Sequence, residues 1–187
     1  MRCALLLAAA LTFATGSASA EVKVAESFRF YTIDGLTKEA IAKSVSRNVP
    51  FSLGKRAWAF AVWNIAWTYT PVSLPDRCWA TDVQIEVTAR ITFPRHSQVD
   101  RMDPEIRAKW DSMMAALYRH EKQHVQHGID AANKLDAQIP SLREADCENL
   151  RRKVNAVAAG LIREGSDLDK RYDAETDHGR LEGTWFE

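Results

Sequence analysis

Strict alternation of hydrophobic and polar residues distinguishes one segment of the chain. Over residues 83–93, the odd positions hold valine, isoleucine, alanine or phenylalanine, and the even positions hold charged or polar side chains. Because successive side chains of a strand point to opposite faces, this pattern predicts a strand with one buried and one solvated face. Residues 22–33, which are followed by the turn signal Asp34-Gly35, and residues 56–70, with aromatic side chains on both faces, are also predicted strands.

Hydrophobic residues at helical spacing dominate the second half. Asp103-Pro104-Glu105 combines a capping aspartate, a proline at the first helical position and an acid in the first turn, which predicts a helix to about residue 138. A much shorter helix is predicted after Thr37, whose hydroxyl would cap it.

Pro140 closes the long helix, and a second one is predicted to begin near Asp146. Beyond residue 165 the hydrophobic spacing loosens, and we expect a tail there. Strands followed by two long helices predict an α+β fold with a small, mainly antiparallel sheet.

Residues 1–20 have the pattern of a secretory signal: a basic start at Arg2, an apolar stretch, and small residues at positions 18 and 20 before the expected cleavage site. The remaining residues 21–187 are expected to form a single domain. We therefore expect a periplasmic or secreted protein.

The chain has 25 basic and 25 acidic side chains, and removal of Arg2 with the leader leaves 24 basic ones, so the mature protein is nearly neutral. Near neutrality without a block of like charge gives no electrostatic basis for nucleic-acid binding. No later apolar run has the length of a membrane span. The sequence leaves the oligomeric state open.

The most specific motif is His-Glu-Lys-Gln-His at residues 120–124, inside the first long helix. Residues four apart lie on one helix face, so His120 and His124 would converge on one metal ion. Glu121 lies on the flank of that face, where its carboxylate would serve as general base toward a zinc-activated water. The alternative is that both histidines are hydrogen-bonded, inert residues of a packed helix face.

Two cysteines remain after the leader, Cys78 and Cys147. In an exported chain such a pair is expected to form a disulfide, and closing a loop of about 70 residues would stabilise the fold by about 4 kcal/mol.

Taken together, several segments resemble the bacterial predicted secreted zinc-dependent protease family, also known as domain of unknown function nine hundred and twenty-two. The matching segments span essentially the whole mature chain: residues 31–37, Cys78, residues 93–95, residues 120–124, Cys147 and residues 172–179. This resemblance implies a zincin-like α+β metallopeptidase that acts on a peptide or protein substrate.

A catalytic zinc needs three protein ligands and one open position. His127 lies about 10.5 Å along the helix from His120, so it could share the ion only if the helix broke, for which Gly128 offers a place although good helix formers follow it. The third ligand could also be a glutamate from the region of the second helix. The spacing favours none of the three candidates, Glu144, Glu148 and Glu164. We expect His178 to be the third ligand, since a second helix antiparallel to the first would return the tail to the site.

Other residues receive supporting roles. Asp173 or Asp177 would accept a hydrogen bond from a ligand imidazole. Tyr172 or Arg180 could stabilise an oxyanion, but a core or capping role for Tyr172 and solvent exposure for Arg180 are the favoured explanations. His96, in a polar loop, is expected at the surface.

The expected activity is peptide hydrolysis at zinc. Two alternatives stay open: a non-enzymatic exported module in which zinc ties the tail to the helix, and a metal-dependent amidase that acts on cell-wall peptide. A closed structural zinc site usually takes four protein ligands and has no need of Glu121.

Overall fold

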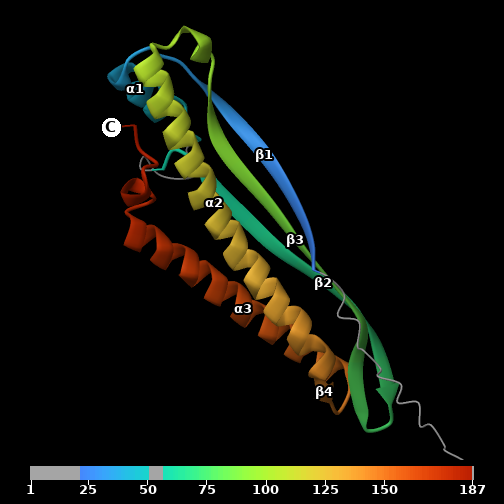
Figure 1. Ribbon diagram of the computed structural model, residues 1–187. Coiled ribbons are helices and arrows are strands. Elements are labelled where there is room, and N and C mark those ends of the chain that lie inside the picture. Colours follow the sequence, from blue (N-terminus) through green and yellow to red (C-terminus); the bar gives the residue numbers. More distant parts are fainter. Residues whose placement is uncertain (1–21, 51–56, 187) are drawn as a thin grey trace, which may run out of the picture.

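The computed structural model describes residues 22–50 and 57–186, so the expected leader lies outside the described residues. The three long strands precede the two long helices, which confirms the α+β class (Figure 1). In chain order the elements are β1 (Lys23–Ile33), α1 (Lys38–Asn48), β2 (Phe60–Leu74), β3 (Arg77–His96), α2 (Pro104–Gln138), β4 (Arg143–Glu144) and α3 (Cys147–Thr176), followed by the short 3-10 helix η4 (Arg180–Glu182). Within the described ranges, no helix has the length and apolar character of a membrane span.

The sheet has the strand order β1-β3-β2, with the short β4 beside the start of β3. β2 and β3 form an antiparallel hairpin, whereas β1 runs parallel to β3, with Phe28 opposite Ile91. The sheet is therefore mixed: the pairings of β3 with β2 and β4 are antiparallel, as expected of a mainly antiparallel sheet, and the parallel β1 is the exception. Alternation in sequence shows which face of a strand is buried but carries no information about the direction of its neighbour.

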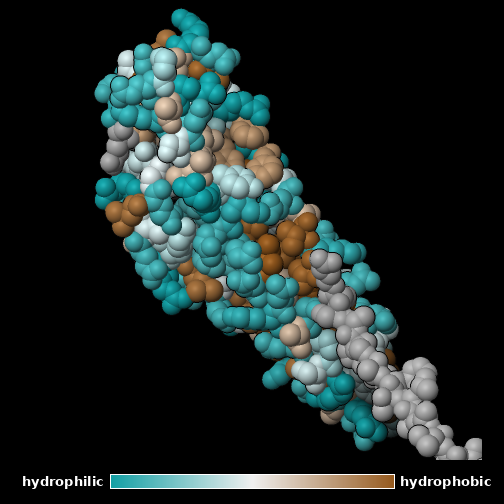
Figure 2. Space-filling model, viewed as in Figure 1, coloured by the Kyte–Doolittle hydropathy of each residue, from teal (hydrophilic) through white to brown (hydrophobic). Residues whose placement is uncertain are grey.

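α2 packs against β2 and β3, and α3 runs antiparallel along α2 (Figure 1). The apolar odd positions of β3 lie beneath the helices, and the polar positions between them are mostly exposed. The surface seen in Figure 2 is largely hydrophilic, with several separate hydrophobic patches.

The capping residues act as the sequence predicts. Thr37 Oγ1 accepts a hydrogen bond from the Ala40 N–H, and the Asp103 carboxylate accepts one from the Glu105 N–H. Asp146 caps α3 through the Asn149 N–H. Each cap satisfies a backbone donor that the first turn of a helix leaves unpaired.

α3 does not end near residue 165 but continues to Thr176, which corrects the expected tail. The apolar spacing stops because polar residues take over the buried face at Asp169, Tyr172, Asp173 and Thr176, which are still at helical spacing. This extra length carries carboxylates back along α2.

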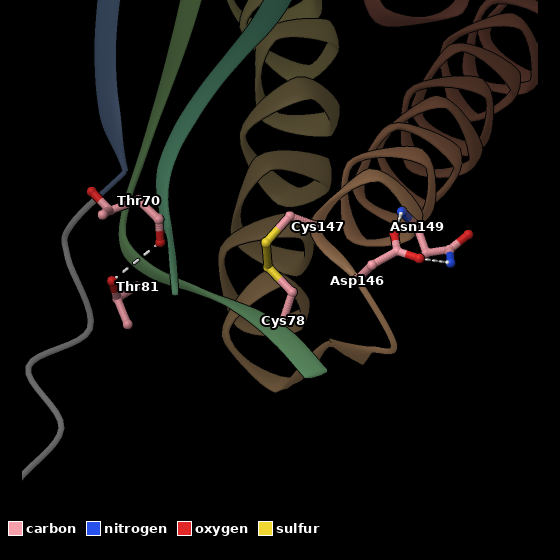
Figure 3. Close-up of a disulfide and its surroundings, with 6 residues drawn as sticks. All are labelled: Thr70, Cys78, Thr81, Asp146, Cys147 and Asn149. Carbon is pink, nitrogen blue, oxygen red and sulfur yellow. Dashed lines mark hydrogen bonds between the residues drawn. A yellow bond between two sulfur atoms is a disulfide. The ribbon is translucent and has the colours of Figure 1, made fainter. Parts of the chain in front are cut away.

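The predicted disulfide is present between Cys78 and Cys147, with Cα atoms 5.1 Å apart (Figure 3). Both the cysteine at the start of β3 and Leu150, one turn along α3, are fully buried. The bond therefore ties the turn end of the β2–β3 hairpin to the first turn of α3.

Candidate metal centre

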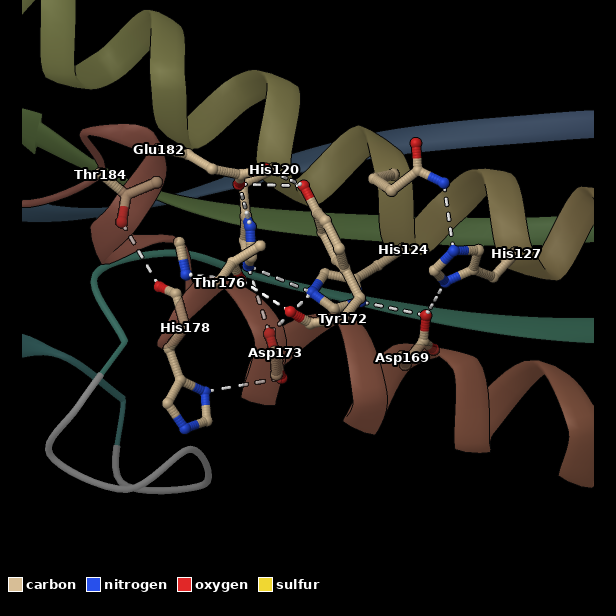
Figure 4. A network of polar contacts seen from close by, with 12 residues as sticks. His120, His124, His127, Asp169, Tyr172, Asp173, Thr176, His178, Glu182 and Thr184 are labelled. Atoms are coloured by element: carbon tan, nitrogen blue, oxygen red, sulfur yellow. Dashed lines mark hydrogen bonds and ion pairs between the residues drawn. The ribbon is translucent and has the colours of Figure 1, made fainter.

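Helix geometry brings the site together from two antiparallel helices. His120, Glu121 and His124 lie on the buried face of α2, and Asp169 and Asp173 lie one turn apart on the facing side of α3 (Figure 4). Because both pairs have the same spacing of four residues, each carboxylate meets an imidazole at the same level of the helix pair.

Three ligand atoms converge at the centre of this arrangement (Figure 4). The Nε2 atoms of His120 and His124 are 3.3 Å apart. Asp173 Oδ1 lies 3.2 Å from the His120 Nε2 and 3.1 Å from the His124 Nε2. The three atoms thus form a nearly equilateral triangle.

The other nitrogen of each imidazole faces a separate carboxylate. His120 Nδ1 lies 2.8 Å from Glu182 Oε2, and His124 Nδ1 lies 3.0 Å from Asp169 Oδ1. An ionised carboxylate only accepts hydrogen bonds, so both Nδ1 atoms must carry the donated hydrogen. A neutral imidazole then has its lone pair on Nε2, and three acceptors face one another across the triangle.

Such a cluster of acceptors is stable only with a positive charge between them. The triangle fits zinc well, because two ligand atoms each about 2.0 to 2.1 Å from a tetrahedral zinc are about 3.3 Å apart. Histidine nitrogen and carboxylate oxygen are also the ligand types that zinc accepts.

A second group of possible ligands does not bring three acceptor atoms together. It consists of His124, His127 and Asp169. Both imidazoles direct Nδ1 at the same oxygen, Asp169 Oδ1, at 3.0 and 2.7 Å. Two N–H donors on one carboxylate oxygen are ordinary hydrogen bonds that require no ion.

The pKa values of the cluster show the same attraction for positive charge. Burial disfavours the charged His124 imidazole, but hydrogen bonds with Asp169 and Asp173 outweigh it and raise its pKa to about 10. The His120 pKa is also raised, since Asp173 and Glu182 outweigh burial. Burial works against the ionised forms of Asp173 and Asp169, yet their hydrogen bonds to the imidazoles lower both pKa values.

Glu121 borders the centre without belonging to the triangle. Its side chain is buried, with the residue only 3 % exposed, and burial raises its pKa to about 7. Oε2 has no hydrogen-bond partner among the described residues. The carboxylate lines a pocket of about 210 Å³ together with both histidines, Asp173 and part of β2. A buried carboxylate oxygen without a partner is costly to maintain.

A family model matches residues 28–179, and its description is "Bacterial protein of unknown function (DUF922)". The chain belongs to this family. The matched range holds His120, Glu121, His124, Asp169 and Asp173, so the centre is part of the DUF922 domain, whereas Glu182 follows just after the range. No curated protein and no solved structure matches the chain.

His178, the expected third ligand, lies at the edge of the same pocket. It follows α3 in a left-handed turn with φ of 53°, and 43 % of its side chain is exposed. Its Nδ1 lies 3.6 Å from Asp173 Oδ2, on the side of that carboxylate away from the triangle (Figure 4). In this DUF922 domain the third converging atom belongs to Asp173.

The other considered ligands lie elsewhere. Glu164 pairs with Lys134, and Glu148 pairs with Arg151 at the start of α3. Glu144 lies in β4 beside Cys78. His127 contacts Asp169 and not the triangle.

Tyr172 and Arg180 already have partners for their donor groups. The Tyr172 ring stacks on His120 with centroids 4.8 Å apart, and its hydroxyl donates to Glu182. Arg180 pairs with Asp177. His96 is not at the surface as expected: it is buried at the end of β3, where Nε2 lies 2.7 Å from the Gly35 carbonyl oxygen.

Sequence reasoning missed Asp169 and Glu182 and gave Asp173 only a supporting role. A signal for two of them was present, since Asp169 and Asp173 repeat the four-residue spacing of the histidines. Glu182 follows two positive-φ residues and Gly179, so its approach to His120 depends on a chain reversal that spacing does not reveal.

Proposed function

We propose that this protein is an exported, zinc-dependent hydrolase whose metal ligands are His120, His124 and Asp173. One observation supports this most strongly: three acceptor atoms 3.1 to 3.3 Å apart, with the opposite nitrogen of each imidazole committed to a carboxylate. Asp173 takes the place that the sequence assigned to His178.

Three protein ligands beside a pocket match a catalytic zinc site, which keeps one position open, better than a structural site, which closes with four. Bound zinc supplies Lewis acidity, which polarises a carbonyl and lowers the pKa of a coordinated water toward about 7. Asp169 and Glu182 keep the imidazoles in the tautomer that directs both Nε2 lone pairs inward.

Glu121 is the proposed general base. In the metal-free protein, burial raises the Glu121 pKa to about 7. Bound zinc would favour the ionised carboxylate, which is the form that accepts a proton. Its unpartnered Oε2 is available to take a proton from a water in the pocket and to pass it to the leaving group. A non-enzymatic zinc module would give no role to this buried carboxylate.

The choice of peptide bonds as substrate rests on the sequence resemblance to predicted zinc-dependent proteases. We also propose that the domain is zincin-like, because α2, the helix that holds the histidine motif, lies along the sheet. A cell-wall amidase would use the same ligands and the same base, so only substrates separate the two activities.

Zinc-loaded mature protein should therefore cleave members of a mixed peptide library, with mass spectrometry as the readout. Glu121→Gln should retain zinc by elemental analysis and lose about 10² to 10⁴ in cleavage rate. Cleavage of purified peptidoglycan but not of the library would favour the amidase. If Glu121→Gln cleaved as fast as the wild type, the proposed base would be wrong.

A further inference from the structure

Trp63 of β2 is the one strand residue tied by a side-chain hydrogen bond to the network around the centre, as far as the described residues show. Its indole Nε1–H donates to Asp169 Oδ2 at 2.8 Å. The other oxygen of the same carboxylate accepts from His124 and His127. Asp169 is thus held on one side by the sheet and on the other by α2.

The indole reaches Asp169 through a gap that two glycines leave. A Cβ on Gly128 of α2 would lie 2.6 Å from the indole Cδ2, and a Cβ on Gly165 of α3 would lie 2.9 Å from Cη2. Neither position has space for a methyl group unless the ring moves. The third glycine in the long helices, Gly160, has nothing within 4 Å of its Cβ position.

We infer that Trp63 is a positioning residue for the metal centre: seated between Gly128 and Gly165, it fixes the Asp169 carboxylate that orients His124. This inference rests on the proposed function, because it assumes that His124 binds a metal ion. Among the described residues, the Trp63 side chain makes no hydrogen bond to His120, His124 or Asp173.

In this role, Trp63 limits rotation of the Asp169 carboxylate. Three N–H donors on two oxygens define one orientation of the Asp169 side chain. Without the indole donor, Oδ2 loses its only side-chain hydrogen bond among the described residues, and the carboxylate is held through Oδ1 alone, about which it can pivot. The Nδ1–H of His124 then loses a fixed acceptor, and Nε2 is no longer held toward the ion.

The competing explanation is that Trp63 only fills space, since it packs against both hydrophobic clusters of the core. Two matched pairs of variants separate the explanations. Trp63→Phe is compared with Trp67→Phe, which shortens another half-buried tryptophan on the same face of β2. Gly165→Ala, which displaces the indole, is compared with Gly160→Ala on the same helix.

Each folded variant is titrated with Zn²⁺ against a competing chelator, and the Co²⁺-substituted form is examined by visible absorption, which reports coordination geometry. We expect Trp63→Phe and Gly165→Ala to weaken zinc binding by about 10-fold or more and to change the cobalt spectrum. Trp67→Phe and Gly160→Ala should match the wild type in both readouts. Unfolding by urea, followed in the metal-free proteins, measures the separate loss of packing.

The results distinguish three cases. Weaker binding and an altered spectrum in the first pair alone support the positioning role. If Trp63→Phe loses stability but keeps the wild-type affinity and spectrum, or weakens binding no more than Trp67→Phe does, the inference is overturned. If the wild type binds neither Zn²⁺ nor Co²⁺, the proposed function itself is wrong, and the inference is refuted with it.

Discussion

At the scale of single residues, the outer carboxylates decide which nitrogen of each histidine faces the centre. Glu182 and Asp169 each accept from a Nδ1–H, which leaves the two Nε2 lone pairs to meet Asp173 Oδ1. If the two imidazoles carried their hydrogens on Nε2, His120, His124 and Asp173 would form only a hydrogen-bonded cluster. The atoms available as ligands therefore depend on residues that would not touch a bound ion themselves.

Single substitutions should show whether Asp173 or His178 is the third ligand. Asp173→Ala removes one of three ligands and should weaken zinc binding by more than about 100-fold, a larger loss than outer partners cause. His178→Ala should weaken it by less than about 10-fold, since Nδ1 approaches the outer oxygen of Asp173. Zinc titration against a chelator measures both, with Glu175→Ala, an exposed carboxylate at the same end of α3, as the control. A larger effect for His178→Ala would restore the ligand set that the sequence favours.

The sequence identifies the α2 residues of the site but not the complete set. His120, Glu121 and His124 are recognisable because their spacing has one geometric meaning on a helix. Asp173 is recognisable only as a supporting residue, because its four-residue spacing from Asp169 places both on one helix face without showing what that face meets. Glu182 depends on the turn through Asp177, His178 and Gly179, all with positive φ, which no periodicity encodes.

At the scale of elements, the decisive feature is that α3 continues past its apolar stripe. Leu150, Val154, Ala158 and Leu161 pack in the core, and the same face then presents Asp169 and Asp173 to α2. A hydrophobic pattern predicts a helix only where the partner surface is apolar. The polar end of α3 was missed because its partner surface is the metal centre.

The disulfide acts at the opposite end of this helix. Cys147 lies 22 residues before Asp169, by subtraction of their numbers, which is about 33 Å of helix. Replacing both cysteines with serine should lower the free energy of unfolding by about 2 to 5 kcal/mol. Zinc affinity should stay within a few-fold of the wild type.

Urea unfolding and zinc titration of the double variant test these two statements, and reduced wild-type protein is the control for the loss of the bond alone. Zinc affinity that falls as far as in Asp173→Ala would show that the disulfide end and the metal centre are coupled.

At the scale of the whole molecule, the proposed centre would link stability to pH and to metal binding. In the metal-free protein the His124 pKa is about 10 against 6.5 unperturbed, and the Glu121 pKa is about 7 against 4.5. Both folded values are raised, so their stabilisation is complete below the unperturbed pKa and is lost as pH rises through the folded one. The Asp173 pKa is lowered, so its contribution is present above 3.8 and is lost in acid.

The metal-free protein should therefore become less stable between pH 6 and pH 9, by the order of a few kcal/mol at most. Saturating zinc should reverse the trend, because the ion competes with protons for the imidazoles and binds better as pH rises. Urea unfolding at both pH values, with a chelator or with zinc, measures the difference. His124→Ala should flatten the metal-free pH dependence. Metal-free stability that rises between pH 6 and pH 9 would contradict this account.

The pattern of hydrophobic and polar residues predicts the sheet and the helices. It does not predict the directions of the strands in the mixed sheet. β3 is predicted by its alternation, yet the parallel neighbour β1 has no counterpart in that signal. The histidine motif is readable because it is local, whereas the rest of the centre arises from the antiparallel pairing of α2 and α3.

The central claim is that one metal ion sits between His120, His124 and Asp173. Anomalous diffraction at the zinc absorption edge, from crystals of the zinc-loaded mature protein, tests it directly. We expect a single strong peak, about 2.0 to 2.2 Å from both Nε2 atoms and from Asp173 Oδ1. No peak at this position, or a peak coordinated by His178 or His127 in place of Asp173, would contradict it.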